Sequence, residues 1–170
     1  MMLETATLFF FPVLMIFAAI SDLLTMTISN RVSIALAVLF VVLAAASGLS
    51  TAQICWHLAS GALILALGFG MFALGWIGGG DAKLAAATAI WLGFDHLGEY
   101  ALVASLLGGL LTLGILVLRH WPVLSIFMNQ AWITRLHEPD TGIPYGIALA
   151  SAGLLLYPES AVWLAAAAGH

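Results

Sequence analysis

The chain has 170 residues, of which 64% are hydrophobic and 7% are charged, and its formal net charge at pH 7 is −4. This much apolar surface has no place inside a water-soluble fold of such a size, which excludes a soluble globular protein. The net negative charge excludes a basic surface for nucleic acid. A single cysteine, Cys55, excludes an internal disulfide framework and a zinc site built from several thiolates.

Six apolar segments follow one another along the chain, and a helix needs ~20 apolar residues to cross a bilayer. We therefore expect an all-α integral membrane protein, folded as one transmembrane domain over residues 1–170, with about six crossings. The fourth segment is short, and we expect it to extend to about Leu97. The sixth is also short and can continue past Pro158 into the apolar tail 161–168. The six segments span residues 5–24, 32–49, 54–77, 82–94, 100–118 and 143–157.

The positions of Lys and Arg predict the orientation of these segments in the membrane. If the six segments alternate in direction, all four cations fall on one side and the other side has none. The positive-inside rule places the cationic side in the cytosol, so both chain ends are predicted to lie outside. The four cations are Arg31, Lys83, Arg119 and Arg135.

The longest polar connection runs from Arg119 to Gly142 and contains Trp121 and Trp132. Tryptophan prefers the headgroup region of a bilayer. We therefore expect a weakly amphipathic interfacial helix over residues 123–136.

Two aspartates stand at the predicted cytosolic ends of apolar segments: Asp22 closes the first, and Asp81 opens the fourth after three glycines. A carboxylate at the centre of a helix in lipid costs ~2.5–3.5 kcal/mol, so two acids beside long apolar runs favour a functional role. Two close carboxylates would share one proton. One could then activate water while the other polarises a carbonyl, which is what peptide hydrolysis requires.

Ordinary structural roles compete with this interpretation. Asp81 could simply cap a helix, which is worth ~1 kcal/mol, and Asp22 could be a solvated residue at a helix end. Gly108 and Gly109 are typical of close packing between helices. His137 has the chemistry of a metal ligand, but Pro139 follows it and no His-Glu-x-x-His spacing exists, so we expect no metal there.

The string Gly78-Gly79-Gly80-Asp81 matches the Gly-x-Gly-Asp signature of intramembrane aspartyl proteases, and its continuation to Leu84 resembles the prepilin peptidases. Two further motifs stand in the family's order. Before the glycines come Ser21-Asp22 and Ile28-Ser29-Asn30, and after them comes Pro144-Tyr145-Gly146. The chain is most similar to the short peptidases that accompany Flp-type, tight-adherence pili. It departs from them at Ser29, where the family usually has proline.

This resemblance implies an aspartyl endopeptidase of the bacterial inner membrane. It would remove the short basic leader of a type IV prepilin at the cytosolic face, just before the substrate's own hydrophobic helix. Asp22 and Asp81 carry over as the catalytic pair, with no cofactor and no metal. The implied partners are the prepilin and the lipid bilayer. The residues expected to shape the site are Gly78, Gly80, Lys83, Asn30, Pro144, Tyr145 and Gly146.

Two other functions remain open at this point. A proton- or ion-coupled transporter would place its acids near the midplane of the membrane and often has repeated halves with broken helices. A noncatalytic membrane scaffold for pilus assembly would keep the fold but tolerate loss of either acid. The resemblance favours the enzyme.

Overall fold

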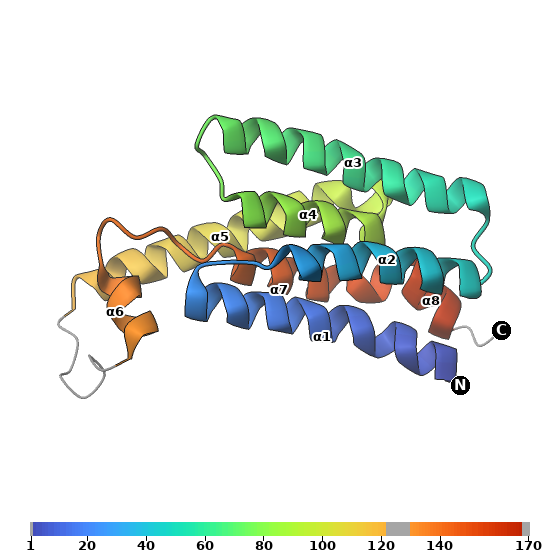
Figure 1. Cartoon of the computed structure of the whole chain (residues 1–170), viewed down its shortest axis with the longest axis horizontal. Helices are drawn as coiled ribbons and strands as arrows, with labels where there is room; N and C mark the ends of the chain where they lie inside the picture. Colours follow the sequence, from blue (N-terminus) through green and yellow to red (C-terminus); the bar gives the residue numbers. More distant parts are fainter. Residues whose placement is uncertain (1, 122–129, 168–170) are drawn as a thin grey trace.

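The computed structural model describes residues 2–121 and 130–167, and the described elements are all helices. The long helices run side by side in an elongated bundle (Figure 1). Each of the six predicted apolar segments contains one helix, which confirms the all-α prediction. The elements are α1 (Met2–Thr25), α2 (Asn30–Ala46), α3 (Thr51–Ala73), α4 (Gly79–Leu92), η1 (Phe94–His96), α5 (Leu97–Arg119), α6 (Ala131–His137), α7 (Gly146–Leu156), η3 (Tyr157–Glu159) and α8 (Ala161–Ala167).

The outer surface of the bundle is rich in large apolar side chains. Phe9, Leu106 and Leu110, for example, are each more than 60% exposed. By length and composition, three described helices could cross a membrane: residues Thr7–Thr25, Thr51–Ala73 and Phe94–Arg119. Counting a bent pair formed by α7, η3 and α8 gives four. The expected six crossings are therefore not confirmed, because α2 and α4 have only 17 and 14 residues.

Helix α4 lies at the centre of the bundle, where it packs against α2, α3 and α7. It is built mostly from small residues, and eight of its 14 residues are buried, so neighbouring helices can approach it closely. The nearest neighbour is α3. A Cβ on Gly61 of α3 would lie 2.2 Å from Cγ1 of Ile90, and the Ser60 hydroxyl donates to the Ala89 carbonyl at 2.8 Å. These contacts fix the C-terminal half of α4 against α3.

A cluster of aromatic side chains holds the far end of α4 in place. The Trp91 ring packs against Phe11 of α1, Phe40 of α2 and Tyr157 of η3. Its indole N–H donates to the Leu36 carbonyl at 3.0 Å, so the only polar atom of this buried side chain is satisfied. Tyr157 in turn donates to the Thr7 carbonyl of α1.

The ends of two helices differ from the sequence prediction. Helix α4 stops at Leu92 instead of continuing to about Leu97, because Gly93 adopts a left-handed φ of +71° that ends the helix. The last apolar stretch is not one continuous helix. It bends by 46° between η3 and α8, where Ser160 adopts an extended ψ of 145°, and the tail resumes as α8.

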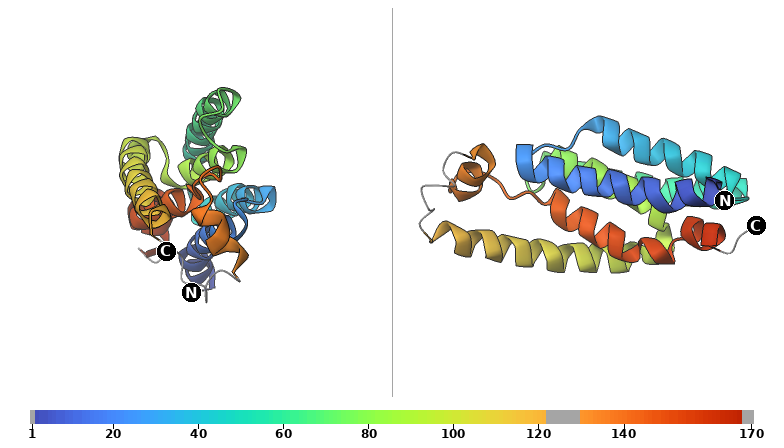
Figure 2. Two further views of the ribbon diagram at one scale, coloured as in Figure 1. Left: turned by 90° about the vertical axis from the view of Figure 1, so that its left-hand side faces the viewer. Right: turned by 90° about the horizontal axis from the view of Figure 1, so that it is seen from below.

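The polar connection after α5 contains one short described helix, α6. The interfacial helix predicted over 123–136 is thus helical from Ala131 onward, and its first part falls in residues 122–129, outside the described residues. Helix α6 lies beyond the end of α1 and beside the end of α5 (Figures 1 and 2).

Candidate active site

One end of the bundle gathers the C-terminal ends of α1, α3 and α5 and the N-terminal ends of α2, α4 and α7 (Figure 1). Asp22 lies in the last turn of α1, and Asp81 lies in the first turn of α4. Both line one cavity of about 300 Å³. The structure therefore brings the two acids to one cavity, and their role as a catalytic pair stays a prediction.

Asp22 is held by the start of α7. Its side chain is almost completely buried, and its Oδ2 accepts a hydrogen bond of 2.7 Å from the Gly146 N–H. A Cβ on residue 146 would lie 2.7 Å from that same oxygen and 2.7 Å from Cδ1 of Ile28. Only glycine lets the backbone come this close, so the Pro144-Tyr145-Gly146 motif serves the first acid directly.

Asp81 lies against the start of its own helix. It is the third residue of α4, and Gly78 is the N-cap. A Cβ on Gly78 would lie 2.8 Å from Oδ2 of Asp81, so glycine lets the backbone come close to this carboxylate. Each acid is therefore packed against the backbone of one glycine.

The third glycine of the motif, Gly80, is explained by the close approach of Ile28. A Cβ there would lie 3.3 Å from the Cβ of Ile28, in the segment that follows α1. The left-handed glycines among the described residues are Gly48, Gly75 and Gly93, so Gly80 is needed for close approach and not for its φ. This contact sets the distance between the chain that follows Asp22 and the helix that carries Asp81.

Substitution of Gly80 is expected to act in proportion to side-chain size. Gly80→Ala should reduce substrate cleavage only mildly, because Ile28 has to yield by a few tenths of an ångström. Gly80→Leu should lower the rate ~100-fold or more, since a displacement of ~1 Å at a reacting group costs about that much. The measurement is the cleavage rate of the purified enzyme, with thermal stability recorded in parallel. Wild-type cleavage by a stable Gly80→Leu protein would contradict this role.

Two further predicted residues meet beside the acids. The Lys83 ammonium donates to Oδ1 of Asn30 at 2.9 Å, which links the first turns of α4 and α2, and both residues line the acid cavity. Ser29 caps α2 by accepting the Arg31 N–H at 3.3 Å. A serine can thus start the helix where the family usually has proline.

The remaining predicted residues, Pro144 and Tyr145, lie between the acids and α5. Pro144 is fully buried. The Tyr145 hydroxyl is 3.0 Å from Oγ1 of Thr112, and its ring packs where a Cβ on Gly108 would be, at 3.3 Å. Gly108 is thus a close-packing site as expected, whereas Gly109 has open space in front of it.

Two arginines anchor the loop that leads into α7, a role that the sequence analysis did not foresee. The Arg119 guanidinium donates to four loop carbonyls at 2.7–3.5 Å, those of Leu136, Pro139, Thr141 and Gly142. Arg135 donates to the Leu24 carbonyl at the end of α1, at 3.2 Å. Arginine suits this task because its planar fork presents five donors. These bonds fix the loop immediately upstream of Gly146, whose N–H donates to Asp22.

All four Lys and Arg residues of the chain lie at the end of the bundle that holds the acids. Arg31 is in the first turn of α2, Lys83 is in the first turn of α4, Arg119 ends α5, and Arg135 contacts the end of α1. The exposed acids Glu99 and Glu159 lie at the opposite end. The one-sided charge distribution inferred from the sequence is therefore present in the fold.

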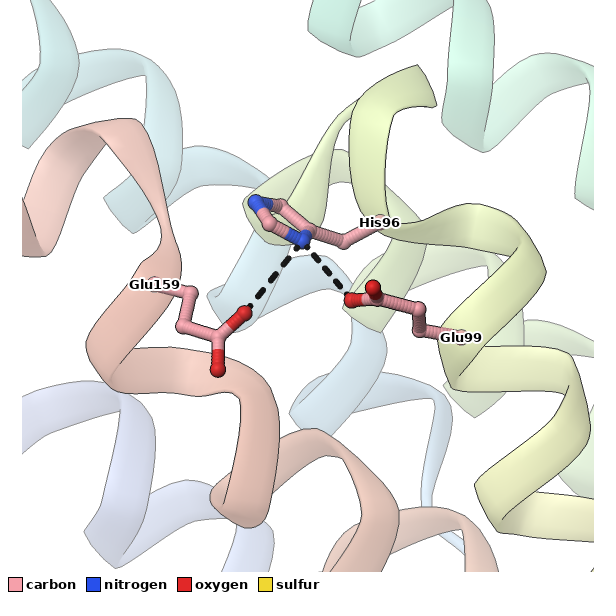
Figure 3. Close-up of polar contacts among 3 residues, drawn as sticks. All are labelled: His96, Glu99 and Glu159. Atoms are coloured by element: carbon pink, nitrogen blue, oxygen red, sulfur yellow. Dashed lines mark hydrogen bonds and ion pairs between the residues drawn. The ribbon is translucent and has the colours of Figure 1, made fainter.

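Within the described residues, one group of side chains has the composition and spacing of a metal site. His96, Glu99 and Glu159 bring three potential ligand atoms within 4.8 Å of one another (Figure 3). His96 Nδ1 is 3.2 Å from Glu99 and 3.7 Å from Glu159, and both glutamates are more than half exposed. Polar contacts of one histidine ring with two solvated acids account for this geometry. The group lies at the end of the bundle away from Asp22 and Asp81.

Fold and cavity together define a helical membrane protein with two carboxylates at one end of its bundle. The model of the type IV leader peptidase family matches residues 9–113, which is more than half of the chain, so the chain belongs to that family. The family indicates a protease. The match includes Asp22 and Asp81. It ends before α7 and before the loop over residues 138–145 that Arg119 anchors, here called the Arg119 loop. No curated protein and no solved structure matches the chain.

Proposed function

We propose that the protein is an aspartyl endopeptidase that removes the leader of a type IV prepilin, with Asp22 and Asp81 as its catalytic pair. The observation that carries this proposal is the shared cavity, in which each carboxylate packs against the backbone of a glycine. Family membership supports the reaction class. The Flp-type prepilin as substrate rests on the sequence resemblance.

The chemistry follows from placing two carboxyl groups in one small cavity. Repulsion between them favours the state in which they share one proton. The ionised carboxylate takes a proton from water, and the water oxygen attacks the scissile carbonyl carbon. The protonated carboxyl group donates to the carbonyl oxygen, and a proton then passes to the leaving amine as the C–N bond breaks. The Gly146 N–H holds the Asp22 side chain in position throughout.

The location of the acids favours this proposal over a transporter. Asp22 and Asp81 lie at helix ends and not midway along the helices that carry them. A carboxyl pair at this depth meets a peptide bond that immediately precedes a substrate helix, without drawing that bond into hydrocarbon. By contrast, a coupled transporter needs its acids near the midplane.

The orientation proposed here places the acid end in the cytosol and both termini outside, with six crossings. In a Cys55→Ala background, Asp140→Cys should resist an impermeant thiol reagent in intact cells, whereas Glu99→Cys should react. Both replaced residues are exposed acids, at opposite ends of the bundle, so the two variants are matched in charge. Labelling at residue 140 without permeabilisation would place the acids outside and rule out cytosolic leader removal.

The direct test is cleavage of a co-expressed Flp-type prepilin by the wild-type protein, followed by mass spectrometry of the product's N-terminus. The expected product begins at the first residue of the substrate's hydrophobic helix. An uncleaved prepilin in the presence of a folded, membrane-inserted enzyme would refute the proposal for that substrate.

A further inference from the structure

A second cavity, of about 570 Å³, lies directly beside the acid cavity and shares Asp81 with it. Helices α3 and α5 form its walls, and α4 and α7 form its floor. Seen along the bundle, α3 and α5 stand on separate sides of that floor (Figure 2). Apart from Asp81, Ser105 and two tyrosines, every residue that lines this groove is apolar.

The shape of the groove suits a helix better than a small molecule. The α5 wall presents Ala101, Ala104, Ser105, Gly108 and Gly109, which recur at helical spacing and so form one continuous face. The floor is also made of small side chains, Ala82, Ala85 and Ala148, and the opposite wall is bulky and aliphatic. Small residues let a second helix backbone approach closely, which is the main source of helix association in lipid.

The groove has a direction. One end is formed by Asp81 and Tyr145, and the other by Leu97 and Ala101 near the start of α5. Residues 97–109 of α5 cover roughly 18 Å at the rise of an α-helix. An apolar helix lying there would have its first residues at Asp81 and the rest of its length alongside α5.

We propose that this groove, between α3 and α5, binds the N-terminal hydrophobic helix of the substrate and thereby places the scissile bond at the two acids. This inference rests on the proposed function. The groove fits a helix that has bulky apolar residues on one face, because the small residues on α5 and α4 leave room for such side chains. Asp81 lies where the two cavities meet, so it marks the boundary between helix and scissile bond. Tyr145, whose hydroxyl is 3.0 Å from that of Thr112, lines the groove at the same end.

A third groove provides an internal control. It lies on the other side of α4, between α2 and α3, with a volume of about 450 Å³. Ala37 and Ala62 line it, and it shares Asn30 and Lys83 with the acid cavity, but neither Asp22 nor Asp81 lines it. Because neither carboxylate faces this groove, substitutions at Ala37 and Ala62 should leave cleavage unchanged.

The first experiment compares two partly buried alanines, Ala104→Phe in the proposed groove and Ala37→Phe in the control groove. Ala104→Phe should lower kcat/KM for full-length prepilin by about tenfold or more, because one misfitting group in an apolar pocket has an effect of this size. Ala37→Phe should stay within about twofold of wild type. Thermal stability of both purified proteins shows whether either variant is simply misfolded.

The second experiment detects the bound helix directly and does not depend on turnover. In an Asp22→Asn background, a benzophenone amino acid is placed at Ser105 or at Ala62, two exposed positions in the two grooves. Irradiation with co-expressed prepilin should give an enzyme–prepilin adduct from position 105 and none from position 62. An adduct only from position 62, or only lipid adducts from position 105, would overturn the proposal.

The outcomes separate this inference from the function on which it rests. If wild type cleaves prepilin but Ala104→Phe cleaves equally well and no adduct forms at position 105, the groove proposal fails and the peptidase proposal stands. If wild type cleaves no prepilin, the proposed function fails and the groove proposal fails with it.

Discussion

Asp22→Asn and Asp81→Asn are each expected to abolish prepilin cleavage while the protein still accumulates in the membrane. An amide can neither take a proton from water nor share one with the remaining carboxylate. Asparagine keeps the size of the side chain, and at position 22 its carbonyl can still accept the Gly146 N–H, so the fold should survive. Removal of a general acid or base usually costs 10²–10⁴-fold, and a pair that acts as a unit loses more than either part suggests.

The matched controls are the other two aspartates of the chain. Asp95 in η1 and Asp140 in the Arg119 loop are exposed, and neither lines the acid cavity. Asp95→Asn and Asp140→Asn should therefore cleave at nearly the wild-type rate. Cleavage is followed by the mobility shift of the processed pilin, with membrane levels of each variant measured by immunoblotting. Substantial cleavage by Asp22→Asn or Asp81→Asn would end the aspartyl mechanism. If the protein were a noncatalytic scaffold, its function would tolerate both Asp22→Asn and Asp81→Asn.

The sequence alone predicts the local features of this site because their signals are local. Three consecutive glycines before Asp81 indicate close backbone approach, and the structure assigns Gly78 and Gly80 to different neighbours, the Asp81 carboxylate and Ile28. The apolar segments predict the helices for the same reason. Their ends were harder to predict, because the φ of Gly93 and the bend between η3 and α8 depend on where the chain must turn.

Other parts of the site could not be predicted because they are made by tertiary packing. The Gly146 N–H and the Asp22 carboxylate are 124 residues apart in sequence, and no pattern in either segment specifies the other. In the sequence, Arg119 indicates only the orientation of the helices in the membrane. Its four contacts with backbone carbonyls form only when the loop has folded back on α5. The substrate groove is an intermediate case. The spacing of small residues on α5 is visible in the sequence, but whether they face a neighbour or open space depends on the placement of α3.

Gly146→Ala is expected to have nearly as large an effect as loss of an acid. The new methyl group would overlap the Asp22 carboxylate oxygen at 2.7 Å, the Asp22 Cβ at 3.0 Å and the Ile28 side chain at 2.7 Å. Because three atoms on two packed segments are involved, rotation of one side chain cannot relieve the overlap. Either Asp22 leaves its position or α7 moves away and breaks the hydrogen bond to it. A displacement of ~1 Å at a catalytic group costs ~100-fold in rate.

Gly142→Ala provides the control, because residue 142 lies in the same loop, is exposed, and has nothing within 4 Å of where a Cβ would be. It should cleave prepilin like wild type. The comparison is made by kcat/KM in purified, detergent-solubilised protein, with thermal unfolding recorded for both variants. The informative result is a Gly146→Ala protein that unfolds near the wild-type temperature yet cleaves ~100-fold more slowly. Full activity in that protein would show that Asp22 does not depend on the start of α7, and the predicted role of the Pro144-Tyr145-Gly146 motif would then be wrong.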